Sequence, residues 1–187
     1  MATITERVYT PEDLLKIADR PMPELVDGEL VERPPMGQKA DMVAMTIGYF
    51  LGAYSRNTLA GVVGGAHGSF QIFADDPNRV RIPDVSFTRR DRLPDGPAEG
   101  HGRVAPDLVV EVISPNDDAS GLRRKIREFL KAGVPLIWVV DHEARDIQVT
   151  RADRTGELLL EGDALDGGAV LPGFSVPVAV LFEGIDP

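Results

Sequence analysis

The chain has 187 residues and a formal net charge of −10; apolar residues make up 43% of it and charged residues 27%. This balance is typical of a globular protein and excludes disordered or collagen-like chains, and the length suits a single domain over residues 1–187. Its longest apolar runs are far shorter than the roughly 20 residues that cross a bilayer, so we expect no membrane helix. Cysteine is absent, which excludes disulfides and thiolate metal sites.

The charge is unevenly distributed along the chain. Residues 79–131 hold 11 basic and 9 acidic residues, whereas the flanks are strongly acidic. A solvated charged face and a surface that meets the phosphates of a transient substrate are both compatible with this segment. Its candidate phosphate contacts are Arg81, Arg89, Arg90, Arg92, Arg103, Arg123, Arg124 and Arg127. The first nine residues lack the apolar segment of a secretory signal, so we expect a cytoplasmic protein.

The first elements in chain order are two helices and a hairpin. Thr10, followed by proline and two carboxylates, is typical of a helix start and predicts a short helix to about residue 18. Residues 24–31 alternate around Asp27-Gly28, the strongest short-range signal of a β-hairpin. Apolar residues recur at helical spacing over residues 38–58, which predicts a long helix.

The middle of the chain is expected to be mostly extended. Residues 61–68 are rich in glycine, which indicates a connection between elements. Residues 69–73 and 80–88 are predicted strands joined by a turn, and residues 89–102 form a predicted polar loop.

A nearly continuous apolar run over residues 107–113 predicts a strand that is covered on both faces. A basic helix over residues 119–132 follows, with candidate caps among residues 114–118 and Gly133 at its end. Residues 135–141 form another apolar strand. Strand, helix and strand with short connections predict a parallel pair within the sheet. Short β-like runs and glycine turns alternate after residue 146.

Two carboxylates stand within these apolar strands. Glu111 lies inside the run 107–113, and Asp84 lies between apolar neighbours in the preceding strand. A buried carboxylate is costly unless it is paired or bound to a metal. If the two strands are adjacent, both acids can share a divalent cation, and Mg²⁺ suits a site with one or two carboxylates. Lys125 adds an ammonium group, which can position a metal-bound water or offset phosphoryl charge.

Each of these residues also has a purely structural interpretation. Glu111 can bond to a helix end or an arginine, and Lys125 can be one exposed cation beside its neighbouring arginines. Glu24 can be an ordinary hairpin residue. Asp107 shares a face with Glu111 but stands four residues away, about 13 Å at strand rise, so we interpret it as a cap at the strand start.

Five motifs in order resemble the Uma family of proposed bacterial endonucleases. They are ELVDGELV at 24–31, PDV at 83–85, PDLVVEVISP at 106–115, Lys125 with Phe129 and AGV at 132–134, and WVVD at 138–141. This family belongs to the restriction-endonuclease-like superfamily with the signature PD-(D/E)XK. The resemblance implies an α/β fold: a mixed sheet core flanked by helices, with an N-terminal hairpin and extra C-terminal strands.

The resemblance also assigns roles to single residues. It makes Asp84 the aspartate of the signature and Glu111 its second acid, both as metal ligands, with the Val112 carbonyl as an additional ligand. The lysine normally stands two residues after the second acid, where this chain has Ile113, so Lys125 would replace it from the following helix.

Further family positions lie outside the signature. Glu24 matches the family's N-terminal glutamate, which would approach the same metal. Two positions depart from the family pattern: Gly121 stands where an aspartate is frequent, and Lys39 or its neighbours stand where a histidine is frequent. Contacts with the substrate are therefore expected to differ here.

Other enzyme classes find less support. The histidines at 67, 101 and 142 lack the spacing of a zinc site, and one tryptophan gives few platforms for sugar rings. The sequence also lacks a Gly-x-Ser-x-Gly elbow, a GxGxxG pattern and a P-loop ending.

The expected function is therefore a Mg²⁺-dependent (or Mn²⁺-dependent) endonuclease that hydrolyses phosphodiester bonds of nucleic acid, with DNA as the first candidate. The residues do not separate DNA from RNA. The alternative is a catalytically inactive nuclease fold that serves as a binding or regulatory module. A homodimer is also expected, because two sites cut both strands of a duplex most easily.

Overall fold

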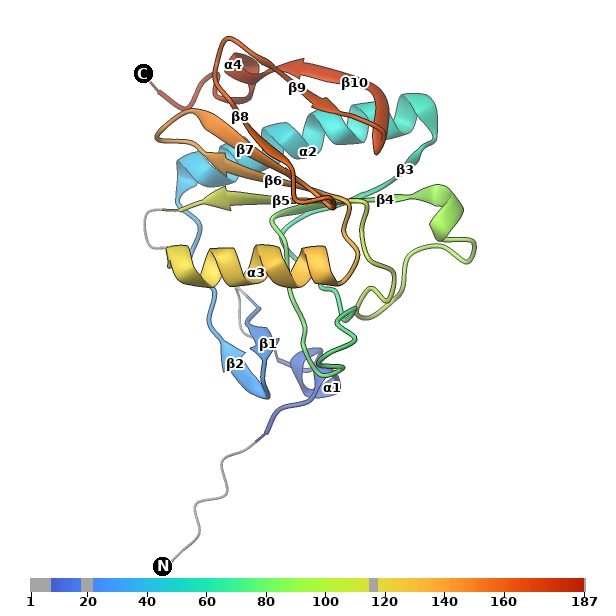
Figure 1. Cartoon of the computed structure of the whole chain (residues 1–187). Coiled ribbons are helices and arrows are strands. Elements are labelled where there is room, and N and C mark those ends of the chain that lie inside the picture. Colours follow the sequence, from blue (N-terminus) through green and yellow to red (C-terminus); the bar gives the residue numbers. More distant parts are fainter. Residues whose placement is uncertain (1–7, 18–21, 115–117, 187) are drawn as a thin grey trace, which may run out of the picture.

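A six-stranded mixed sheet forms the centre of the computed structural model, which describes residues 8–17, 22–114 and 118–186 (Figure 1). Its order is β3-β4-β5-β6-β7-β8. Only β5 and β6 pair in parallel, as the strand-helix-strand pattern predicted; the other neighbours in this sheet are antiparallel. The strands are β3 Gly61–Gly64, β4 Val85–Arg89, β5 Leu108–Ile113, β6 Leu136–Asp141, β7 Asp146–Arg151 and β8 Gly156–Leu159.

One long helix covers each face of this sheet. Helix α2 (Gln38–Thr58) has the predicted bounds and lies on one face, and α3 (Ala119–Lys131) lies on the other (Figure 1). Val110 packs in the cluster on the α2 side and Val109 in the cluster on the α3 side, so β5 is buried on both faces as predicted. No helix among the described residues has the length and apolar content that crossing a membrane requires.

The C-terminal elements thicken the layer on the α2 side. Strands β9 (Ala164–Gly167) and β10 (Leu171–Pro177) form an antiparallel pair, and the short helix α4 (Val178–Leu181) follows directly. Phe174 and Phe182 are buried in the same apolar cluster as α2. This segment therefore belongs to the core, and a homodimer stays a prediction.

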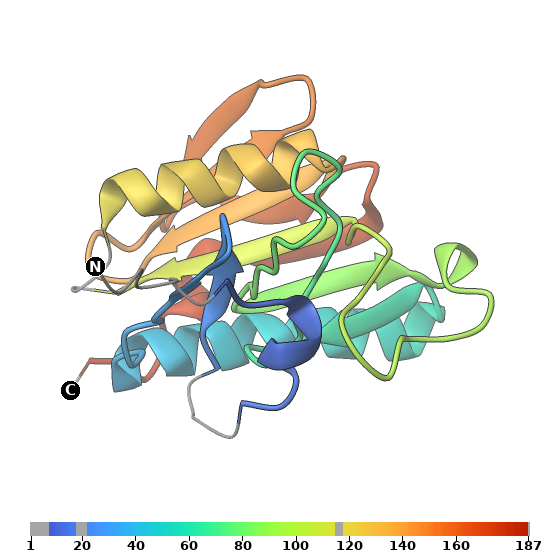
Figure 2. The ribbon, with the colours of Figure 1, turned by 90° about the horizontal axis from the view of Figure 1, so that it is seen from below.

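The N-terminal hairpin lies on the α3 side of the sheet, next to α1 (Pro11–Leu14) (Figure 2). It consists of β1 (Glu24–Val26) and β2 (Glu29–Val31), as predicted. Its two turn residues both have positive φ, 52° at Asp27 and 82° at the following glycine, as a type I′ turn requires. Helix α1 ends at Leu14, before the predicted end at residue 18, which lies outside the described residues.

Two predictions for the middle of the chain are wrong. The segments 69–73 and 80–88 are not two full strands: Phe70 and Val80 make only isolated bridges, and β4 begins at Val85. Pro83 has no N–H to donate, and the preceding N–H bonds to a side chain, so a ladder cannot form there. The glycine-rich stretch contains strand β3, which pairs with β4. Glycine stands at 61 because a Cβ there would lie 2.3 Å from the Thr88 carbonyl oxygen.

Helix α3 has a defined start and end. The Asp118 carboxylate accepts hydrogen bonds from the N–H groups of Ser120 (3.0 Å) and Gly121 (2.9 Å). Among the other predicted caps, residues 115–117 lie outside the described residues. Gly133 has a φ of 92° just beyond the helix and donates its N–H to the Leu130 carbonyl at 3.1 Å.

Gly133→Ala should therefore lower the free energy of unfolding by about 1–2 kcal/mol, because a Cβ strains this left-handed backbone. Gly48→Ala is a matched control inside α2, where no atom beyond the helix's own neighbouring backbone lies within 4 Å of the added Cβ. It should raise stability by up to about 1 kcal/mol. Urea unfolding of both variants measures the two changes, and equal signs would contradict this explanation.

Candidate active site

A cavity of about 660 Å³ opens where the segment after β2, the start of β4, the end of β5 and the first turns of α3 meet. Its lining includes all the residues that the sequence suggested for the site. They come from four distant parts of the chain: Glu24, Asp84, Glu111, Val112 and Lys125. The fold thus brings the sequence candidates to one cavity.

Asp84 lies one residue before β4 and extends its pairing with β5. Its N–H donates to the Val110 carbonyl at 3.2 Å, and its Oδ2 accepts the Val112 N–H at 2.8 Å. Because the N–H and C=O of one strand residue point the same way, the Val112 carbonyl faces this edge too. Asp84 Oδ1 accepts a hydrogen bond from Nη2 of Arg33 at 3.1 Å.

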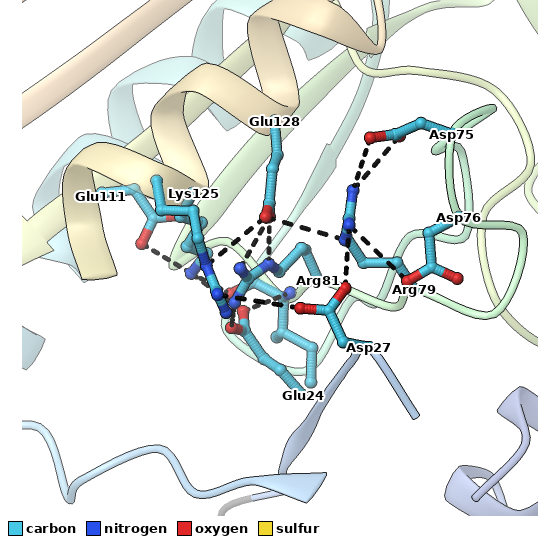
Figure 3. A network of polar contacts seen from close by, with 11 residues as sticks. Glu24, Asp27, Asp75, Asp76, Arg79, Arg81, Glu111, Lys125 and Glu128 are labelled. Carbon is cyan, nitrogen blue, oxygen red and sulfur yellow. Dashed lines mark hydrogen bonds and ion pairs between the residues drawn. The ribbon is translucent and has the colours of Figure 1, made fainter. Parts of the chain in front are cut away.

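Glu111 points from β5 toward α3, on the same side of the strand as Val109. Its Oε2 accepts a hydrogen bond from Lys125 at 2.8 Å (Figure 3). Its Oε1 is buried and has no hydrogen-bond partner among the described residues. Burial raises the pKa of Glu111 to about 8, against the opposing effect of Lys125. The carboxyl is therefore held in a place that does not favour its ionised form.

Lys125 joins three groups at the inner face of α3. Its Nζ donates to Glu111 and to the Ile82 carbonyl, both at 2.8 Å, and lies 3.1 Å from Glu24 Oε1. Burial lowers the pKa of Lys125, but the charges of Glu111 and Glu24 more than offset this, so the pKa is raised. Phe129, one turn later, is buried on the same helix face. The ammonium therefore keeps its charge and its position.

Glu24 holds this lysine from the first strand of the hairpin. Its Oε1 also accepts the Ile82 N–H at 2.8 Å, and its Oε2 lies 2.6 Å from Nη1 of Arg81. Burial raises the pKa of Glu24, but the positive charges of Lys125 and Arg81 together have the larger, opposite effect. The pKa of Glu24 therefore lies below its ordinary value. Both oxygens of Glu24 are thus engaged by cations and an amide, which suits a residue that positions Lys125.

A wider charge network fixes the hairpin to α3. Arg81 Nε donates to Glu128 Oε2 at 2.7 Å, and Arg79 connects Asp75 and Asp27 (Figure 3). No sequence motif indicated Glu128, because its hydrogen-bond partner Arg81 stands 47 residues earlier. Arg33 was missed too, although it stands only two residues after the recognised hairpin motif.

Only some of the arginines predicted to contact phosphate are free to meet a substrate. Arg81 is 4% exposed and held between two carboxylates, so it cannot contact a substrate as predicted. Arg89 pairs with Asp91, and Arg92 donates to Asp107 at 3.0 Å. The side chains that stay exposed include Arg103, Arg123 and Arg127.

The structure also locates the two residues that depart from the family pattern. Gly121 lies in the first turn of α3 and lines the cavity. Lys39 lies in the first turn of α2, where its Nζ pairs with Asp186 at 2.6 Å. Lys39 is therefore bound to the C-terminal segment and does not line the cavity.

Comparisons with known proteins agree with this architecture. A family model named Uma2, described as "Putative restriction endonuclease", matches residues 11–179. A crystal structure titled as a putative nuclease belonging to DUF820, from Anabaena variabilis, superposes with a TM-score of 0.77 at 18% sequence identity. The likeness covers 95% of this chain and 99% of that chain, and it confirms the predicted fold class. A search of curated proteins finds no match. Because the family model spans most of the sequence, the chain belongs to the Uma2 family.

Proposed function

We propose that this protein is a divalent-metal-dependent endonuclease that hydrolyses phosphodiester bonds of nucleic acid, with DNA as the first substrate to test. Membership of a family described as putative restriction endonucleases supports a nuclease function. The observation that carries the proposal is the placement of Lys125: its ammonium joins Glu111 and Glu24 on the cavity wall that also holds Asp84.

The donor set on this wall fits Mg²⁺ or Mn²⁺. Glu111 offers a buried oxygen that lacks a hydrogen-bond partner in the described part of the chain, and Asp84 lies at the adjoining strand edge. Among the described residues, no three His, Cys, Asp or Glu side chains gather as a ready metal site. Mg²⁺ commonly uses only one or two carboxylates, with waters and substrate oxygens completing its shell. Asp84 and Glu111 would hold the ion, and the Val112 carbonyl is the further ligand that we propose.

Such an ion supplies Lewis-acid polarisation of a phosphoryl oxygen and lowers the pKa of bound water. The chain's own contribution is positioning and charge. Lys125 has a raised pKa and stays protonated, and its three N–H groups already face Glu111, Glu24 and the Ile82 carbonyl. It would therefore act mainly through its positive charge on the attacking water and the phosphoryl oxygens. Glu24 keeps Lys125 in place while Glu111 faces the ion.

The decisive experiment is cleavage of supercoiled plasmid and of single-stranded DNA in Mg²⁺, Mn²⁺ or EDTA. We expect cutting with metal, none with EDTA, and none for Asp84→Asn, which removes the carboxylate charge but keeps its shape. Circular dichroism and Mn²⁺ titration by calorimetry show whether the variant is folded and whether it has lost the ion. If the wild type binds no metal and cuts neither substrate, the proposal fails and an inactive binding module becomes the better description.

A further inference from the structure

Arg33 is a cation of the cavity to which no motif pointed. It lies in the segment after β2, with 16% of its side chain exposed. Nη1 donates to the Ala66 carbonyl at 3.0 Å, and Nη2 donates to Asp84 Oδ1 at 3.1 Å. A guanidinium has five N–H donors. These two hydrogen bonds leave three of them without a partner in the described part of the chain.

The other cations that line the cavity are each shared between two carboxylates. Lys125 lies between Glu24 and Glu111, and Arg81 lies between Glu24 and Glu128. Arg124 lies 3.6 Å from Glu128 and 3.9 Å from Asp27. Arg33, by contrast, has one carboxylate neighbour among the described residues.

The cavity lining as a whole is acidic. Four cations, Arg33 among them, face six carboxylates: Glu24, Glu32, Asp41, Asp84, Glu111 and Asp118. The side chains thus give the cavity a net negative charge, so a phosphodiester needs, beside the proposed metal ion, a positive group that is not already neutralised. Of the four cations, Arg33 is the one that best keeps this capacity.

We propose that Arg33 binds a non-bridging oxygen of the scissile phosphate, an inference that rests on the proposed nuclease function. Its planar fork suits two phosphate oxygens better than an ammonium does. The Ala66 carbonyl anchors one side of the fork. Because Nη2 touches the carboxylate that would hold the ion, a phosphate bound next to Asp84 comes within reach of the remaining N–H groups. Arg33 would then stabilise the negative charge that develops on the phosphoryl oxygens.

The test compares Arg33→Ala and Arg33→Lys with Arg56→Ala, which removes the same charge from an exposed position of α2 outside the cavity. Binding of a fluorescein-labelled oligonucleotide, single- or double-stranded, is measured by anisotropy in Ca²⁺. Mn²⁺ affinity is measured by calorimetry, and kcat and KM are measured in Mg²⁺. Arg33→Ala should bind the oligonucleotide about tenfold more weakly and lower kcat/KM about a hundredfold. Its Mn²⁺ affinity should equal or exceed that of the wild type, because Asp84 loses a competing cation. Arg33→Lys should recover part of the lost oligonucleotide binding and of the lost kcat/KM.

Several results would overturn the assignment. Binding and cleavage equal to those of Arg56→Ala would show that Arg33 does not touch the phosphate. Weaker Mn²⁺ binding by Arg33→Ala would show that the residue only supports the metal site. If the wild type binds the oligonucleotide but never cuts it, the proposed function fails, while the binding of Arg33→Ala relative to Arg56→Ala still decides the contact. If the wild type does not bind the oligonucleotide, both proposals fall.

Discussion

Replacing Lys125 with methionine should slow nucleic-acid cleavage about 10³-fold and lower the free energy of unfolding by about 3 kcal/mol. Methionine keeps most of the side-chain length but removes the ammonium group that joins Glu111, Glu24 and the Ile82 carbonyl. Glu24 would then lose one of its two cations, and the Glu111 carboxyl and the Ile82 carbonyl would lose the donor that they share, which is costly for buried groups. Cleavage assays and urea unfolding measure the two effects separately.

A matched control for the stability effect is Arg127→Met, which removes one positive charge from the exposed face of the same helix. It should change the free energy of unfolding by less than about 1 kcal/mol. If the folded Lys125→Met variant cuts at a rate within tenfold of the wild type, the lysine serves stability alone. If its stability matches that of Arg127→Met, the buried contacts of Lys125 carry less energy than we infer.

Local signals were enough to predict the centre of the fold. The unbroken apolar run of β5, the caps of α3 and the glycine after it all lie within one stretch of chain, and β6 follows by a short connection. Glu111 was recognisable because a carboxylate inside such a run needs an explanation. Asp84 was recognisable in the same way in the preceding segment, and Lys125 as an ammonium that such a site can use. The resemblance to a known family then assigned their roles and added Val112 and Glu24.

Long-range contacts account for what could not be predicted. Arg33 meets a carboxylate 51 residues away, and nothing in its own neighbourhood distinguishes it from a solvated arginine. The extended segment before β4 looked like a strand, but Pro83 and the bond from Ile82 to Glu24 keep it out of the ladder. Gly61 looked like a turn residue, although close approach of the neighbouring strand requires glycine there.

Replacing Glu111 with glutamine should reduce cleavage by about 10³-fold or more and weaken Mn²⁺ binding, because the amide cannot carry the negative charge of the carboxylate that would bind the ion. It should also change how stability depends on pH in EDTA. Burial raises the folded-state pKa of Glu111 from the ordinary 4.5 to about 8. Below pH 4.5 the carboxyl is protonated in both states, so its contribution to stability is fully present. Between 4.5 and 8 the unfolded chain loses the proton and the folded chain keeps it, so stability falls as pH rises.

The wild type should therefore lose on the order of 1 kcal/mol of unfolding free energy per pH unit across this window, measured by urea unfolding from pH 5 to 8.5. Glu111→Gln should lack this slope. Three charged groups face the carboxyl, namely Asp84, Glu24 and Lys125. Glu24 has a lowered pKa and Lys125 a raised one, so neither titrates between the ordinary pKa of Glu111, 4.5, and its raised pKa of about 8.

Equal pH profiles for the wild type and Glu111→Gln would contradict the raised pKa, and full cleavage by the variant would remove Glu111 from the site. The two expected results together have a single physical explanation. A carboxyl whose ionisation destabilises the metal-free protein contributes little to stability at neutral pH, yet its ionised form is the one that binds a divalent cation. Adding Mn²⁺ at pH 7 should then displace the Glu111 proton and recover the stability that ionisation costs, in the wild type and not in the glutamine variant.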